Sequence, residues 1–216
     1  MALEIFDQTQ KLHGLGTPER SLLNYAALLH SIGQYINFKS YHRHSKYIIS
    51  HAQLRGFTDE EVLLIGNVVR FHRKSEPQKS DEIKEFSRNQ RRILQILAAM
   101  LRVAVGLDRG QTQSVKQLAL EIEDKQIHIF ISGKGDLELD LWGARRLVEP
   151  LERALERKIV IEKLAGSFSG HFSADYIFIL YPYPLSFHSV IGNPFAALPF
   201  ANYIGCKKMN QKEDER

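Results

Sequence analysis

The chain has 216 residues, of which 44% are hydrophobic and 25% charged, and it carries a formal net charge of +4 at pH 7. These proportions are those of a globular protein and exclude wholesale disorder, collagen and a continuous coiled coil. The single cysteine, Cys206, excludes a disulfide framework and a cysteine-rich zinc site, and it fits a reducing compartment. Residues 1–10 lack the basic and apolar regions of a signal peptide, so we expect a cytoplasmic protein.

Residues 1–110 are expected to form a helical domain. Apolar side chains recur at helical spacing in four stretches, namely 22–29, 47–52, 64–69 and 93–104. Thr58 and Glu61 have the spacing of a capping box, which predicts that the third helix begins there. Glycines and prolines between the stretches separate one helix from the next.

In residues 111–164 the period of the apolar side chains changes from 3.6 to 2. Leucines and isoleucines alternate with other residues in three short stretches, 118–122, 127–131 and 137–141. This alternation predicts three strands joined by tight turns. A helix over 144–157 that kinks or restarts at Pro150, followed by a strand over 158–163, completes the pattern. The sequence therefore predicts an α+β protein with a small antiparallel β-β-β-α-β domain after the helical one.

Residues 165–216 are expected to form an irregular, apolar tail. No formally charged side chain occurs between Asp175 and Lys207, and the segment is rich in aromatic and aliphatic residues. A membrane-spanning helix needs about 20 apolar residues in regular geometry, and four prolines in this segment disfavour one. We therefore predict no transmembrane helix.

Positive charge is concentrated in the helical part. No Asp or Glu occurs from Arg20 to Thr58, where arginines and lysines alternate with histidines, and a second basic stretch runs from Arg70 to Arg102. Such clusters are found on solvated helix faces, and they are equally typical of sites that bind anions. A divalent metal is the other ligand that clustered histidines suggest, but hydrolase sites with two metals also need carboxylates. No Asp or Glu lies near His30, His42 or His44 in the sequence, which favours the anion.

Six short segments suggest a relationship to a known family. In chain order they are 2–8, 22–33, 42–45, 54–57, 70–74 and 101–109. Their order and spacing resemble the C-terminal half of the exopolyphosphatase / guanosine pentaphosphate phosphatase (Ppx/GppA) family. The helix around His30 is similar to the His-Asp doublet helix of the HD superfamily, and the predicted small domain is similar to the family's last domain. The resemblance covers about residues 2–163 and implies a helical HD-like domain at 1–110.

The resemblance implies a module that binds polyphosphate or a guanosine polyphosphate and that contributes to a homodimer. Family members carry two actin-like lobes with phosphate loops and a catalytic carboxylate, but this sequence has no glycine-rich loop after a strand. We therefore expect the isolated chain to be inactive and to hold no cofactor; the family's divalent cation, Mg²⁺, would belong to those lobes. The residues implied for phosphate are His42, Arg43, His44, His72, Arg73 and Lys74, with Arg20 and Arg70 as helpers.

Two alternatives to this phosphate-binding module stay open. A metal-dependent phosphohydrolase of the HD type needs two aspartates, but Ser31 and Val105 occupy their positions and His30 alone remains as a remnant of the motif. Asp108 is close by in sequence, and we expect it to pair with Arg109 or Arg102. A nucleic-acid binder could use the basic residues at 88–92, but no recognition motif accompanies them, which makes nucleic acid an unfavoured partner.

Overall fold

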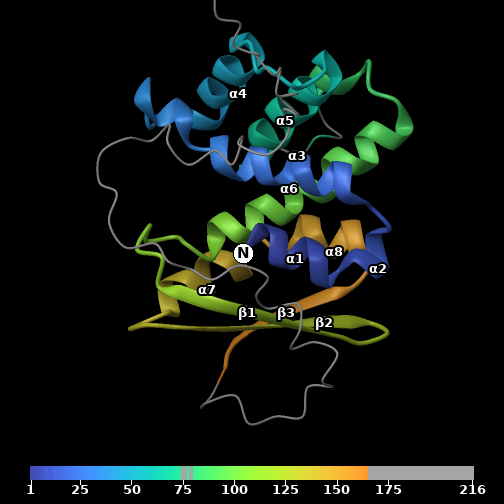
Figure 1. Cartoon of the computed structure of the whole chain (residues 1–216). Coiled ribbons are helices and arrows are strands. Elements are labelled where there is room, and N and C mark those ends of the chain that lie inside the picture. Colours follow the sequence, from blue (N-terminus) through green and yellow to red (C-terminus); the bar gives the residue numbers. More distant parts are fainter. Residues whose placement is uncertain (74–76, 78–79, 165–216) are drawn as a thin grey trace, which may run out of the picture. The chain divides into compact units, whose positions relative to one another are not determined.

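The computed structural model describes residues 1–73, 77 and 80–164, in which a helical part is followed by a three-stranded sheet with helices (Figure 1). The helical part contains α1 (Ala2–Gln8), α2 (Gln10–His13), α3 (Thr17–Leu29), η1 (Ile32–Tyr35), α4 (Tyr41–His51), α5 (Asp59–Phe71), η3 (Asp81–Ile83) and α6 (Arg88–Gly106). Then follow β1 (Val115–Ile122), β2 (Gln126–Gly133), α7 (Glu138–Arg145), α8 (Glu149–Leu155) and β3 (Lys158–Lys163). The predicted α+β class is confirmed, and the predicted tail at 165–216 lies outside the described residues.

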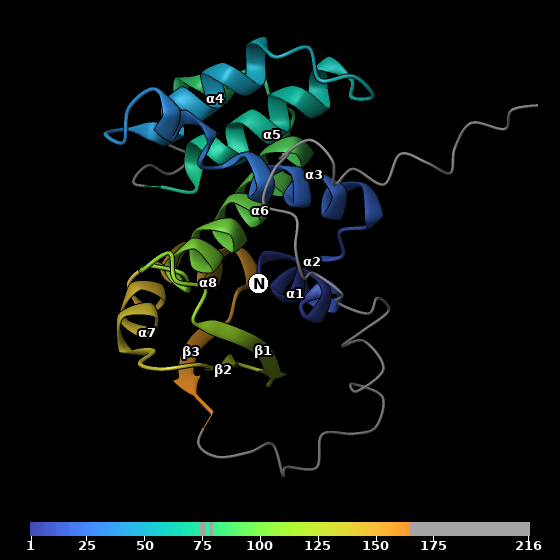
Figure 2. The same ribbon diagram turned by 60° about the vertical axis from the view of Figure 1, so that its left-hand side comes forward.

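Local capping fixes where two of the longest helices, α5 and α6, begin. The Thr58 hydroxyl accepts the N–H of Glu61, and the Glu61 carboxylate accepts the N–H of Thr58 at 2.8 Å, which confirms the predicted capping box of α5. Ser87 and Gln90 make the same reciprocal pair at the start of α6. Nearly every apolar side chain of α6 is buried, because this helix packs against α3 and α5 as well as α7 and α8 (Figure 2).

The sheet has the strand order β1-β2-β3. Strand β2 pairs antiparallel with β1 and parallel with β3, so the sheet is mixed and the predicted all-antiparallel arrangement is wrong. Alternate residues of β2 are buried: Ile127, Ile129 and Ile131. Their neighbours across the sheet, such as Leu120 on β1 and Ile161 on β3, are also buried, so one face of the sheet supplies part of the core.

The third predicted strand, 137–141, is wrong because it forms the beginning of α7. Leu137 and Leu141 are buried, whereas Leu139 is exposed, and residues four apart share a helix face. Positions 137 and 141 also share a face in a strand, so the short pattern fits both structures. The predicted strand at 158–163 is confirmed as β3 (Lys158–Lys163), and so is the restart of the helix at Pro150, because α8 begins at Glu149. Residues 144–145, however, are the end of α7.

The helical part and the sheet are joined through α1 and α6. The side-chain amide of Gln8 donates to the carbonyl of Leu118 and accepts the N–H of Leu120 at 2.8 Å, so it pairs with the outer edge of β1 as a neighbouring strand would. None of the helices in the described part of the chain is long and apolar enough to cross a membrane. The apolar segment at 165–216 lies outside that part.

Candidate functional site

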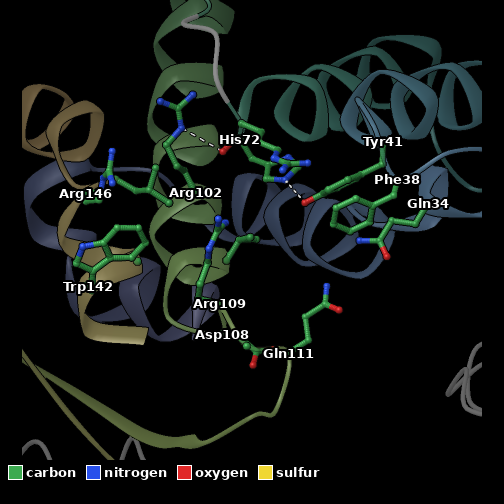
Figure 3. Close-up of a pocket in the computed structure, with 15 residues that line it drawn as sticks. Gln34, Phe38, Tyr41, His72, Arg102, Asp108, Arg109, Gln111, Trp142 and Arg146 are labelled. Atoms are coloured by element: carbon green, nitrogen blue, oxygen red, sulfur yellow. Dashed lines mark hydrogen bonds between the residues drawn. The ribbon is translucent and has the colours of Figure 1, made fainter. Parts of the chain in front are cut away.

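A cavity of about 750 Å³ lies beside the C-terminal end of α6 (Figure 3). Its walls come from η1 and the beginning of α4, from the end of α5, from the loop after α6 and from α7. The polar and aromatic side chains that line it include Gln34, Phe38, Tyr41, His72, Arg73, Arg102, Asp108, Arg109, Gln111, Trp142 and Arg146. Four guanidinium groups against one carboxylate give the cavity a positive character.

One wall depends on a close approach between α6 and α7. A Cβ atom at Gly106 would lie 2.8 Å from the Cα atom of Ala144, so only glycine lets the two helices come this near. The carboxylate of Asp140, which is buried on α7, accepts the N–H of Arg109 at 2.9 Å and that of Gly110 at 3.4 Å. These bonds fix the loop after α6 and thereby the position of the Arg109 side chain in the cavity.

The opposite wall is held by Ser45 on α4. Its hydroxyl donates to the carbonyl of His30 at 2.9 Å and accepts the N–H of Gly33 at 2.8 Å. A Cβ atom at Gly33 would lie 2.3 Å from the carbonyl oxygen of Tyr41, so a glycine is required where η1 meets α4. This contact places Gln34 and Phe38 beside Tyr41 at the cavity.

The four arginines of the cavity differ in what they contact. Arg102 is buried and donates to the carbonyls of Phe71 at 2.8 Å and His72 at 3.1 Å, so it caps the end of α5. The guanidinium of Arg73 lies 4.8 Å from the ring centre of Tyr41, and that of Arg146 lies 4.7 Å from the ring centre of Trp142. Among the described residues, no carboxylate forms an ion pair with Arg73, Arg109 or Arg146, which leaves three cations for an anion.

The carboxylate in the cavity, Asp108, has a structural partner. Its Oδ1 atom accepts the N–H of Gln113 at 2.8 Å, which closes the loop between α6 and β1. The expected partner was Arg109 or Arg102, and the structure instead gives this bond to a backbone N–H of its own loop. Asp108 therefore shapes the cavity wall without neutralising an arginine through a described ion pair.

A buried tyrosine–histidine pair closes the inner end of the cavity. The Nδ1–H of His72 donates to the carbonyl of Val69 at 2.5 Å, and the Tyr41 hydroxyl lies 3.3 Å from Nε2. Because a carbonyl can only accept, Nε2 of a neutral His72 is the acceptor from Tyr41. Burial is the main reason that the pKa of His72 falls to about 3; nearby His30, His42 and Arg102 lower it further. Burial raises the pKa of Tyr41, and this effect is larger than that of the nearby positive charges of Arg73 and Arg109, which lower it.

The histidines do not fit a divalent cation. The ring of His72 lies 5.6 Å from that of His30 and 6.5 Å from that of His42, measured between centres. Both nitrogens of His72 are engaged as described above, and Nδ1 of His30 donates to the carbonyl of Ala27 at 2.7 Å. Within the described ranges no three His, Cys, Asp or Glu side chains are placed to hold a metal ion. We therefore assign no metal-dependent step to these residues.

The residues that the sequence suggested for phosphate lie in several places. Arg73 and His72 line the cavity. His42 is buried beside His72, and the ring of His30 also packs against that of His72. Arg20 is bound at 2.6 and 2.7 Å by both carboxylate oxygens of Asp7. His44 is half-buried on α4 and lines neither this cavity nor the second one described below, and Lys74 lies outside the described residues.

Arg43 and Arg70 belong to a second cavity, of about 410 Å³, between α4, α5 and η3. A carboxylate is already present there, because Glu82 accepts from Lys46 at 2.6 Å and from Arg70 at 3.3 Å. Burial would raise the pKa of Glu82, but the hydrogen bond and charge of Lys46, together with Arg70, outweigh it and lower that pKa. This cavity is therefore a weaker anion site than the first.

The sequence did not single out Arg109, Arg146 or Trp142 as site residues. The sequence contains two signals for them. Arg109 is a basic residue just after a long helical pattern, and Trp142 is followed four residues later by Arg146. The sequence indicates Arg109 only as part of the segment 101–109 and as a partner for Asp108. Trp142 lies between the predicted strand at 137–141 and the predicted helix at 144–157, which contains Arg146. Only the packing of α7 on α6 brings these residues to one cavity.

The comparisons with known proteins agree on one family. The family model described as Ppx/GppA phosphatase, domain III, matches residues 1–141. Three similar proteins are each called guanosine-5'-triphosphate,3'-diphosphate pyrophosphatase. That of Pseudoalteromonas translucida (strain TAC 125) is 33% identical over 50% of this chain and 21% of its own length. That of Aeromonas hydrophila is 33% identical over 60% of this chain and 26% of its own length. That of Vibrio vulnificus is 27% identical over 62% of this chain and 27% of its own length. The chain thus spans about a quarter of the length of these relatives.

Proposed function

The chain belongs to the Ppx/GppA phosphatase family, as its sequence suggested, and from this premise we propose that it binds a guanosine polyphosphate or polyphosphate in the cavity beside α6. The observation that carries the proposal is the group of three arginines, Arg73, Arg109 and Arg146, around one cavity without carboxylate partners in the described residues. Arginine binds phosphoryl oxygens through two parallel N–H groups, so three of them suit a ligand with several phosphates.

The names of the relatives support a guanosine polyphosphate as one ligand class. Because the chain spans about a quarter of those proteins, we assign hydrolysis itself to a complete phosphatase in which this chain is one module. A divalent cation of the kind the family implies would then be bound by residues other than those described, which do not fit one. This module would contribute ligand binding, and formation of a homodimer stays a prediction.

The test is a binding titration with guanosine-5'-triphosphate,3'-diphosphate and with long inorganic polyphosphate. Arg109→Gln removes a charge-assisted contact worth about 1.5–3 kcal/mol, so we expect the Kd for both ligands to rise by roughly 10- to 150-fold. Binding should also weaken as salt is raised from about 50 to about 200 mM, because phosphate contacts release counterions. Calorimetry at two salt concentrations measures both effects.

The matched control is Arg88→Gln, which removes the same charge from an exposed residue at the other end of α6. Affinity for the phosphate ligands should stay unchanged in this variant. If Arg88→Gln weakened binding as much as Arg109→Gln, the basic face at 88–92 would be the anion site, and tighter binding of duplex DNA there would favour the nucleic-acid alternative. Salt-independent binding, or none, would contradict the proposal.

The metal-dependent alternative has its own test. Phosphate release from these ligands in the presence of magnesium or manganese, abolished by His30→Ala, would show that a metal site of the HD type operates in this chain. The geometry favours binding over this alternative, because no three His, Cys, Asp or Glu side chains of the described residues are placed to hold a metal ion, and ring nitrogens of His30 and His72 are already engaged in hydrogen bonds.

A further inference from the structure

One exposed aromatic residue in the cavity lies beyond the segment that the family model matches. Trp142, on α7, follows the last matched residue, 141, and it is the protein's sole tryptophan. Its side chain lines the cavity, yet 51% of its surface stays exposed. A large exposed ring beside a cavity is a common feature of sites that recognise a flat, apolar group.

Arg146 holds this ring from one side. The two residues are one helical turn apart, and the guanidinium of Arg146 lies 4.7 Å from the ring centre of Trp142. A guanidinium over an indole is attracted to the face of the ring and leaves the remaining exposed surface of the ring open to a ligand. The pair is therefore an aromatic platform with a cation attached to it.

Of the three arginines around the cavity, Arg146 belongs to the platform, which leaves Arg109 and Arg73 for phosphate groups. Figure 3 shows Trp142 and Arg146 on one side and Phe38 with Tyr41 on the other, with Arg109 between them. Arg73 is tied to the second side by its position over Tyr41. Linear polyphosphate consists of phosphates alone and has no group that can stack on an aromatic ring, whereas a nucleotide combines a flat base with a chain of phosphates.

We propose that Trp142 and Arg146 bind the base of a nucleotide by stacking, while Arg109 and Arg73 hold its phosphates. This inference rests on the proposed function, because it assigns a preferred ligand class to the same cavity. Trp142 is then the specificity-determining residue that selects nucleotides with several phosphates over inorganic polyphosphate.

The test compares guanosine triphosphate with inorganic tripolyphosphate, which share the triphosphate and differ in the nucleoside. Stacking of a base on an aromatic side chain is worth about 1–3 kcal/mol, so the nucleotide should bind roughly 5- to 150-fold more tightly. Trp142 is the only tryptophan, so its fluorescence reports directly on the platform. We expect guanosine triphosphate to quench it strongly, and tripolyphosphate to leave it nearly unchanged.

Calorimetry on two Trp142 variants and one control completes the test. Trp142→Leu should remove the preference for the nucleotide and leave tripolyphosphate affinity unchanged, whereas Trp142→Phe should keep part of the preference. Tyr35→Leu removes an exposed aromatic that does not line the cavity, so it is the matched control and should behave as the parent protein. The melting temperature of each variant shows that it is folded.

Failure of this inference and failure of the proposed function give different results. Equal affinity for the two ligands, both lost in Arg109→Gln and neither changed in Trp142→Leu, would overturn the platform and leave the phosphate site standing. Absence of binding for both ligands would overturn the two together. A nucleotide preference that survives Trp142→Leu would place the base elsewhere and also overturn the platform.

Discussion

His72 is buried among positive or protonatable groups, and this environment keeps its imidazole neutral. Arg102 donates to its carbonyl, Tyr41 bonds to its ring, and the rings of His30 and His42 are neighbours. A protonated His72 would be buried beside these groups with its proton on Nε2 directed at the Tyr41 hydroxyl. Neutral His72 instead accepts from Tyr41 and keeps that hydroxyl at the inner end of the cavity.

This burial predicts loss of stability in acid. The pKa of His72 is about 3 in the folded protein against a usual value of 6.5, so the unfolded chain takes up the proton first as pH falls. The stabilisation is present above about pH 6.5 and decreases below it by up to about 1.4 kcal/mol per pH unit until about pH 3. Urea unfolding at a series of pH values measures this slope.

The variant His72→Gln is expected to be less stable at pH 7 and to have a smaller acid slope. Some slope should persist, since burial also lowers the pKa of His13. The Nε2–H of that ring donates to the carbonyl of Phe6, and its Nδ1 accepts the N–H of Leu15. The exposed His51, changed to Gln, is the control and should keep the parent slope. An unchanged slope in His72→Gln would show that burial of this imidazole is not the cause of the acid sensitivity.

At the scale of elements, the sequence predicted those helices and strands whose signals are long or locally capped. The capping box at Thr58 and the 19-residue α6 are examples, as is β2 with its alternating isoleucines. Prediction failed at 137–141, because five residues fit either period and only burial against α6 decides between them. The same helix, α7, carries Trp142, so the error in the fold also hid part of the site.

The contact between α6 and α7 predicts a sensitive position. Gly106→Ala would place a Cβ atom 2.8 Å from the Cα of Ala144 and 3.1 Å from the carbonyl oxygen of Gly143, and backbone atoms cannot yield as a side chain can. We expect this variant to lose about 1–3 kcal/mol of stability and to bind phosphate ligands more weakly, because the cavity wall moves. Thermal unfolding and the binding titration measure the two effects.

Gly110→Ala serves as the control for this prediction. It lies four residues further on, and a Cβ atom there would meet only side-chain atoms, the nearest at 3.4 Å. Its stability should differ from that of the parent protein by less than about 0.5 kcal/mol. Equal stability of Gly106→Ala and the parent protein would mean that the two helices can separate without cost.

At the scale of the whole molecule, the site is assembled from parts that lie far apart in the sequence. Phe38 and Trp142 are more than a hundred residues apart, and they line one cavity only because α6 packs against helices from both halves of the described chain. A sequence shows that arginines and aromatics are present, but local patterns do not show which of them meet. Local patterns therefore indicate Arg73, which lies in a basic stretch of the sequence, but not Arg109 or Arg146.

The same packing predicts how the described part of the chain unfolds. One core cluster contains Phe6 and Leu97 together with Ile129 and Leu151, so the regions 1–110 and 111–164 bury apolar surface against each other. We therefore expect a single cooperative transition rather than two. Far-UV circular dichroism reports mainly on the helices of the first region, and the fluorescence of Trp142 reports on the second. The two signals should change at the same urea concentration. Midpoints that differ clearly would show that the two regions are stable independently of one another and that the packing of α6 between them does not couple their unfolding.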